Sequence, residues 1–202
     1  MHKITKEKAS MFPEIETGRL ILRMFTPEDL DNLARIFSNP DVMRYLGTSG
    51  EPMTRAETEY ALISIINHWH RHGIGRWAVE HKEERKLIGF GGLRWFEHEG
   101  EGKGRPELVY LLDEPYWRQG LATEIAHASL RFGFEERKFE QVVAMTRPGN
   151  VVSRHILEKK LCMQYVGEKK LFGIDVVQYV ISSAEYDRSA HPIFQYSAPD
   201  PS

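Results

Sequence analysis

The strongest constraint on the fold is an apolar run followed by a turn of small residues and then by an amphipathic helix pattern. The apolar run is Leu108–Leu112, and the turn is centred on Gly120 and Ala122. Apolar residues then recur at the spacing of one helix face, at Leu121, Ile125, Ala128 and Phe132. The segment therefore predicts a strand, a tight turn and a helix from 119 to about 136.

Such a turn directs unpaired backbone N–H groups outward at the N-terminus of a helix. The helix dipole favours negative charge there, so phosphate is the natural ligand. Gly120 lets the backbone come close to an anion, and Ala122 adds little bulk. On these residues alone, an ordinary strand–helix connection without a ligand stays open. Neither Gly-x-Gly-x-x-Gly nor Gly-Lys-Ser/Thr is present.

The remaining pattern predicts helices interspersed among strands, with antiparallel hairpins at both ends. Strands are expected at 19–24, 76–81, 86–95, 107–112, 141–146, 164–172 and 175–182. Further helices are expected from Thr26 to about Asn39, from Thr54 to just before Gly73, and over 150–162. Glu97–Gly104 is expected to be an exposed loop, and residues 1–14 a loose leader. This order indicates an α+β fold.

Composition limits the class of protein. The 202 residues suit one domain, and 41% hydrophobic with 28% charged residues is ordinary for a globular protein. The net charge of −2 gives no general attraction to nucleic acid or anionic membranes. Cys162 is the single cysteine, no apolar run approaches bilayer length, and residues 1–12 lack a hydrophobic signal segment. We therefore expect a cytoplasmic protein without nucleic-acid or membrane partners.

Three motifs carry a family resemblance. Pro115–Glu124 resembles the acetyl-CoA pyrophosphate loop of the GNAT superfamily of N-acetyltransferases, and it is closest to the ribosomal-protein (Rim-type) branch. Pro148–Lys159 looks like that branch's second signature, Pro-x-Asn-x-x-Ser followed by an apolar pair and Glu-Lys. Thr17–Arg23 is similar to its opening strand. The three matches occur in family order and span roughly residues 15 to 183.

The resemblance implies a GNAT fold, with a mixed, mostly antiparallel sheet of about seven strands flanked by helices. It implies one domain over residues 1–183, followed by a tail at 184–202 that is either disordered or a partner-binding arm. The implied activity is direct transfer of an acetyl group from acetyl-CoA to a primary amine, on a protein N-terminus or a small molecule. A non-catalytic CoA-binding module and transfer of a longer acyl group remain alternatives. No metal is expected, and the protein is expected to be a monomer or a homodimer.

The resemblance also assigns CoA-binding residues. It puts the backbone of Leu111 and Leu112 beside the thioester. The N–H groups for the pyrophosphate come from Arg118, Gln119, Gly120, Leu121, Ala122 and Thr123. Arg118 either adds a charge-assisted contact or is a solvated surface arginine. Asn150 either contacts the pantetheine or adenosine side of CoA or only caps a helix.

The proton-transfer residues follow from the same resemblance. Ser153 is expected near the sulfur, in a hydrogen-bonding or relay role, because a serine hydroxyl is a poor acid. Tyr165 is the alternative donor. Glu107 is the candidate base for the acceptor amine. The alternatives are water, and an exposed strand-edge charge with no catalytic duty.

His68 and His72 have a usable metal spacing on one helix face, yet no third ligand is evident nearby. A polar helix end near the acceptor groove is the favoured interpretation. Asp41 and Glu51 are expected to line that groove.

Overall fold

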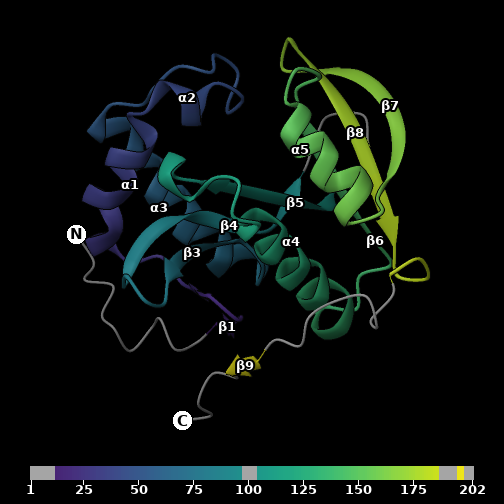
Figure 1. The fold of residues 1–202 in the computed structure, drawn as a ribbon, viewed down its shortest axis with the longest axis horizontal. Helices are drawn as coiled ribbons and strands as arrows, with labels where there is room; N and C mark the ends of the chain where they lie inside the picture. The colour runs from purple at the N-terminus through teal and green to yellow at the C-terminus, as the bar shows by residue number, and fades with distance from the viewer. Residues whose placement is uncertain (1–11, 97–103, 187–194, 198–202) are drawn as a thin grey trace.

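The protein, seen here as a computed structural model, is described over residues 12–96, 104–186 and 195–197. Its strands form one sheet in the order β7-β8-β6-β5-β4-β3-β2-β1-β9 (Figure 1). The strands are β1 Glu14–Glu16, β2 Leu20–Arg23, β3 Arg76–His81, β4 Lys86–Phe96, β5 Arg105–Leu112, β6 Gln141–Thr146, β7 Gln164–Leu171, β8 Ile174–Ser182 and β9 Gln195–Ser197. Neighbours pair antiparallel except β5 and β6, which are parallel.

The helices begin and end at residues suited to those positions. They are α1 Leu30–Phe37, α2 Pro40–Met43, α3 Arg55–His72, α4 Leu121–Arg131 and α5 Val151–His155. Short 3-10 turns occur at Pro27–Asp29 and Glu114–Tyr116, and π-helical turns at Phe132–Glu136 and Ile156–Lys160. Thr54 and Glu57 form a capping box at the start of α3. Gly73 ends that helix in the left-handed conformation, with φ 66°.

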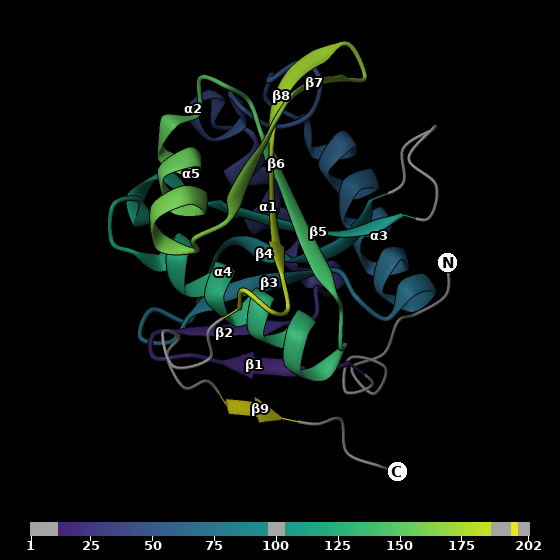
Figure 2. The ribbon, with the colours of Figure 1, turned by 90° about the vertical axis from the view of Figure 1, so that its right-hand side faces the viewer.

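The helices cover both faces of the sheet. Figure 2 shows α3 on one side and α4 with α5 on the other. On the first face α1 and α3 bury a core that includes Ala78, Phe90 and Leu111. On the second face the core includes Ile125 of α4 and Leu108 of β5. The strand β5 therefore supplies alternate residues to two separate cores.

The expected α+β GNAT fold is confirmed, with local differences. The sheet has two more strands than the seven expected, because β1 and then β9 extend it beyond β2 at one edge. Three-residue strands are too short to show an alternating pattern in a sequence. The expected helices at 119–136 and 150–162 each change to a π-helical turn partway along. Of the expected loop at Glu97–Gly104, residues 97–103 lie outside the described part of the chain.

Residues beyond 183 also take part in the described fold. Tyr186 is buried, with its ring centroid 4.9 Å from that of Phe134. Strand β9 pairs with β1, from Glu14 opposite Ser197 to Glu16 opposite Gln195. Part of the segment expected to be a disordered or partner-binding tail is thus attached to the sheet of its own chain.

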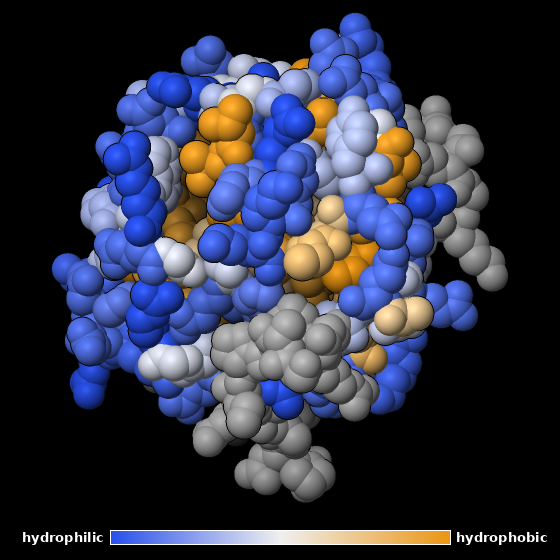
Figure 3. Space-filling view, turned by 45° about the vertical axis from the view of Figure 1, so that its right-hand side comes forward, coloured by the Kyte–Doolittle hydropathy of each residue, from blue (hydrophilic) through white to orange (hydrophobic). Residues whose placement is uncertain are grey.

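Apolar side chains on one face of the surface form separate areas among polar ones (Figure 3). Exposed apolar residues include Val151, Val152, Val166 and Phe172. Over the described residues, no helix combines the length and apolarity needed to cross a bilayer.

Candidate active site

The parallel strands β5 and β6 stop pairing after a short stretch, and the unpaired region of the sheet between them is called the crevice. They pair only at Glu107 with Val143 and at Leu108 with Ala144. Past Leu108, β5 keeps its antiparallel partner β4 as far as Leu112 but has no pairing with β6. The helices α4 and α5 both begin beyond the carboxyl ends of these strands. Ligands of open sheets bind at such a position, because polar backbone groups and helix N-termini meet there.

The backbone of β5 shows which residues face the crevice. The N–H of Asp113 donates to the carbonyl of Ile88, so Asp113 faces β4. Backbone groups of successive residues point to opposite neighbours, which puts Leu111 toward β4 and leaves Tyr110 and Leu112 toward the crevice. The carbonyl of Leu111 does point toward β4. If Gly89 of β4 carried a Cβ, that atom would lie only 2.1 Å from the carbonyl oxygen of Leu111.

These contacts show which way the backbone groups of Leu111 and Leu112 face, the two residues expected beside the thioester. The backbone of Leu111 belongs to the β4–β5 ladder. The carbonyl of Leu112 faces the crevice but accepts a hydrogen bond from Trp117 Nε1 at 2.8 Å. The free crevice-facing groups of β5 are therefore those of Tyr110 and the N–H of Leu112.

The loop before α4 has the backbone conformation of an anion site. Arg118 and Gly120 both have left-handed backbones, with φ 61° and φ 77°. Gly120 is the N-cap of α4, and no side chain caps this helix. Among the described residues, the first N–H of this helix that has an acceptor is that of Glu124, which donates to the carbonyl of Gly120.

The N–H groups of residues 118–123 therefore have no acceptor within the described parts of the chain. Two left-handed residues in one short loop turn such groups to a common side. The arrangement fits the pyrophosphate of an acyl-CoA, since it offers several donors and the positive end of a helix dipole.

The side chains of the expected loop residues take different positions. Arg118 is exposed, Leu121 is buried, and Ala122 and Thr123 are half-buried. Gln119 is fixed through both its side chain and its backbone. Its side-chain Nε2 donates to the carbonyl of Pro115, and its backbone carbonyl accepts a hydrogen bond from Arg19.

Ser153 and Tyr110 meet across the crevice. The Tyr110 hydroxyl lies 3.0 Å from Ser153 Oγ. Burial raises the pKa of Tyr110 to about 12, although the hydrogen bond with Ser153 acts in the opposite direction. Tyr110 therefore keeps its proton at neutral pH. Sequence reasoning missed Tyr110, because it stands 43 residues before Ser153 and was counted only as part of an apolar strand.

Asn150 caps α5, since its side chain accepts a hydrogen bond from the N–H of Ser153 at 3.1 Å. This is the structural role that the sequence left open, and it fixes the turn from which Ser153 projects. Tyr165, the alternative donor, lies on the edge strand β7. Its side chain is 52% exposed and contacts Tyr179, at 5.7 Å between ring centroids.

Glu107 is buried rather than exposed at a strand edge. Its side chain is 3% exposed, and Oε2 accepts a hydrogen bond from Arg94 Nε at 2.6 Å. Glu107 shares a face of β5 with Leu111, the face covered by α1 and α3, whereas Tyr110 points to the other face. The candidate base and the Tyr110–Ser153 pair thus lie on opposite sides of one strand.

The remaining candidates are His68, Asp41 and Glu51. His68 Nε2 accepts a hydrogen bond from the N–H of Trp95 at 3.0 Å. Burial, followed by the charges of His72 and nearby arginines, lowers the pKa of His68 to about 4. No group of three metal-ligating side chains occurs in the portion of the chain that is described. Asp41 pairs with Arg44, and Glu51 is exposed.

The fold, with its short β5–β6 pairing and its loop before α4, is that of the GNAT class of acyltransferases. Comparison with known proteins agrees, because the profile of the family described as "Acetyltransferase (GNAT) domain" matches residues 19–160. The chain belongs to this family and is an N-acetyltransferase.

Individual relatives and solved structures show the same likeness. The chain is 31% identical over 150 residues to the "Uncharacterized N-acetyltransferase YoaA" of Bacillus subtilis, a match that covers 74% of this chain and 82% of that protein. A GNAT-family acetyltransferase from Bacillus anthracis superposes with a TM-score of 0.70 at 25% identity, covering 85% of this chain and 99% of the other. RimL, a ribosomal L7/L12 α-N-protein acetyltransferase in complex with coenzyme A, superposes with a TM-score of 0.67. The identity is 18%, and the match covers 82% of this chain and 95% of RimL.

Proposed function

We propose that the protein transfers an acetyl group from acetyl-CoA directly to a primary amine, in the cytoplasm. The observation that carries the proposal is the loop of residues 118–123, whose N–H groups lack acceptors and open onto the crevice between β5 and β6. The resemblance of Pro115–Glu124 to the CoA loop supports the same ligand, and RimL is a distant likeness that holds coenzyme A.

Each part of the ligand has residues suited to it. The pyrophosphate would take the N–H groups of residues 118–123, with Arg118 as a charged neighbour. Backbone groups of Tyr110 and the N–H of Leu112 would hold the pantetheine arm and polarise the thioester carbonyl. Asn150 would contact the pantetheine with the part of its amide that does not cap α5. Bound acetyl-CoA supplies the activated acetyl group and the thiolate leaving group.

The two proton transfers are assigned to opposite faces of β5. Ser153, supported by the protonated Tyr110 hydroxyl, would donate a hydrogen bond to the leaving sulfur. The amine would approach from the face of α3, where Glu107 would accept its proton directly or through water. Because Arg94 holds Glu107, proton uptake must weaken that ion pair. Water is therefore a serious competitor for this role.

The acceptor is a primary amine on a protein N-terminus or on a small molecule. The Rim-type signatures at Pro115–Glu124 and Pro148–Lys159 favour a protein N-terminus. The test combines calorimetric titration with acetyl-CoA and an assay of thiol release in the presence of N-terminal peptides or small amines. Binding without thiol release in any arm would contradict acetyl transfer to these amines. Thiol release that occurs with a longer acyl-CoA and not with acetyl-CoA would assign a different acyl donor.

A further inference from the structure

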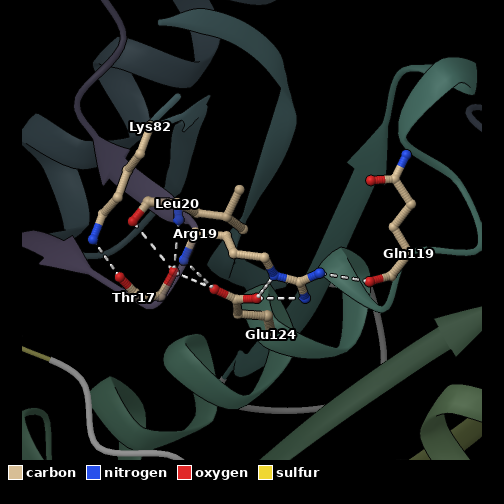
Figure 4. Close-up of polar contacts among 6 residues, drawn as sticks. All are labelled: Thr17, Arg19, Leu20, Lys82, Gln119 and Glu124. Atoms are coloured by element: carbon tan, nitrogen blue, oxygen red, sulfur yellow. Dashed lines mark hydrogen bonds and ion pairs between the residues drawn. The ribbon is translucent and has the colours of Figure 1, made fainter. Parts of the chain in front are cut away.

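Glu124, in the first turn of α4, is held by four donors from another part of the chain. Oε1 accepts from Thr17 Oγ1 at 2.6 Å and from the N–H of Arg19 at 2.9 Å. Oε2 accepts from Arg19 Nε at 2.8 Å and forms an ion pair with Arg19 Nη2 at 2.7 Å. Figure 4 shows this carboxylate turned toward the connection between β1 and β2.

This arrangement matters because of where Glu124 stands. A carboxylate in the first turn of a helix ordinarily interacts with the N-terminal N–H groups and the positive end of the dipole. Here both oxygens are occupied by Thr17 and Arg19, and the N–H groups of residues 121–123 stay free. The same carboxylate without Arg19 would present a negative charge beside the proposed phosphate site and would repel an anion.

Arg19 also holds the loop itself. Its Nη1 donates to the carbonyl of Gln119 at 2.8 Å (Figure 4). Its Nη2 would lie 3.7 Å from a Cβ placed on Gly120. The guanidinium thus fixes the carbonyl that precedes the N-cap of α4 while it neutralises Glu124. Burial raises the pKa of Glu124, but the hydrogen bonds from Thr17 and Arg19 outweigh burial and hold it below its usual value.

We propose that Arg19 is a positioning residue for the phosphates of acyl-CoA, acting through Glu124 and Gln119. It keeps the Glu124 charge away from the first turn of α4 and fixes the loop so that its N–H groups face the ligand. The inference rests on the proposed function, because it assigns a role within the same CoA site.

The test compares three variants, Arg19→Met, Glu124→Gln and the double variant. Met keeps the unbranched apolar stem of the Arg19 side chain without its guanidinium, and Gln keeps the shape of Glu124. Arg19→Met should raise the Michaelis constant for acetyl-CoA about tenfold or more, with a smaller change in kcat. Glu124→Gln should change the Michaelis constant for acetyl-CoA little. The double variant should recover the part of the loss that the Glu124 charge causes, because that charge is gone, while the contact with the Gln119 carbonyl stays lost.

A second donor separates phosphate positioning from general damage to the fold. S-acetylpantetheine carries the thioester and the pantetheine arm but no phosphate, so Arg19→Met should leave its kcat/KM unchanged. The matched control is Arg131→Ala, which breaks an ion pair with Glu135 at the other end of α4. This control should leave the Michaelis constant for acetyl-CoA unchanged.

A double variant as weak as Arg19→Met, or an equal loss with S-acetylpantetheine, would overturn the proposal. Unchanged acetyl-CoA kinetics in Arg19→Met would overturn it as well, and would leave the proposed function standing if the wild type binds acetyl-CoA. A wild type that does not bind acetyl-CoA would remove the proposed function together with this inference. If Arg19→Met does not fold, the double variant compared with Glu124→Gln measures the part of the contribution that Arg19 makes through the Gln119 carbonyl, which should appear with acetyl-CoA and not with S-acetylpantetheine.

Discussion

At the scale of single residues, the contact between Tyr110 and Ser153 connects the two halves of the site. Tyr110 comes from β5 and Ser153 from the first turn of α5, and their oxygens lie 3.0 Å apart. A tyrosine with a pKa of about 12 stays protonated through neutral pH and can keep the serine hydroxyl oriented. Ser153 is then free to direct its own hydrogen toward a thiolate, which a serine alone is too weakly acidic to protonate.

Ser153→Ala should lower kcat about tenfold while acetyl-CoA affinity changes less, since the lost hydrogen bond is strongest when charge develops on sulfur. Tyr110→Phe should show a smaller loss of the same kind, and Tyr165→Phe on the exposed edge strand should show none. Steady-state kinetics of the three variants check this order. A loss of affinity with unchanged kcat in Ser153→Ala would make Ser153 a binding residue.

Glu107→Gln should depress kcat/KM by about 10²-fold at pH 7, the low end of general-base effects. The loss should shrink as pH rises toward the pKa of the acceptor amine, because more amine then arrives neutral. Glutamine still accepts a hydrogen bond from Arg94, so the fold should survive. The control is Glu80→Gln, a strand glutamate that also binds an arginine, Arg23 at 3.0 Å. Wild-type activity of Glu107→Gln at pH 7 would assign deprotonation to water.

The sequence predicts which residues stand at the turns and helix starts of the site better than it predicts which distant residues they contact. Local spacing indicates that Gly120 and Asn150 stand at helix starts, because turns and caps depend on near neighbours. It gives no sign that Arg19 binds Glu124, since 105 residues separate them. It also gives no sign that the backbone of Leu111 faces β4, because the direction of a backbone group depends on which strand lies on each side.

At the scale of elements, the segment from β5 to α4 presents the loop and keeps it in one shape. Left-handed backbones at Arg118 and Gly120 turn the chain between the strand and the helix. The arginine is strained by about 1 kcal/mol in that conformation, and glycine is not. Such strain in an exposed loop is typical of a binding element.

Gly120→Val should weaken acetyl-CoA binding about tenfold or more, because a side chain enters the space beside the loop N–H groups and the backbone prefers to leave φ 77°. Gly173→Val is the matched control. Gly173 has φ 84° and open space around it, in the turn between β7 and β8. Both variants should lose similar stability in thermal unfolding, and only Gly120→Val should lose affinity in a calorimetric titration. Equal affinities would remove the loop assignment.

The periodicity of apolar residues predicts whether a segment is a helix or a strand. It does not predict where a helix changes its hydrogen-bonding pattern or which short strands form. The apolar spacing at Leu121, Ile125 and Ala128 correctly predicts α4. The change to a π-helical turn at Phe132 has no such signal, because side-chain packing decides it. Strands β1 and β9 are likewise invisible in the sequence, since pairing with distant residues creates them.

At the scale of the whole molecule, the crevice and strand β9 lie far apart in the strand order of the sheet. The crevice lies between β5 and β6, and β9 and β1 form the far edge of the sheet (Figure 2). Four strands stand between β5 and β9 in the sheet order, namely β4, β3, β2 and β1. Strand β9 pairs with β1, and Arg19 follows β1. Changes at the C-terminal end should affect stability and leave CoA binding unchanged as long as Arg19 keeps its contacts with Gln119 and Glu124.

Two truncations test this separation and locate the end of the folding unit. A chain ending at Tyr186 loses β9 but keeps the ring packed on Phe134, and a chain ending at Ser183 loses both. The shorter chain also loses Glu185, which accepts hydrogen bonds from the N–H and the hydroxyl of Ser182. Loss of one buried aromatic side chain should cost the shorter chain about 2 kcal/mol more.

In a protein of this size, that difference lowers the Tm by about 4 to 8 °C. Thermal unfolding of the two chains measures it, and acetyl-CoA titration should give the same affinity for both. Equal melting temperatures would show that the domain ends at residue 183 and that Tyr186 only covers its surface. A loss of affinity in the chain ending at Tyr186 would mean that β9 acts on the crevice across the sheet, against the separation that the strand order implies.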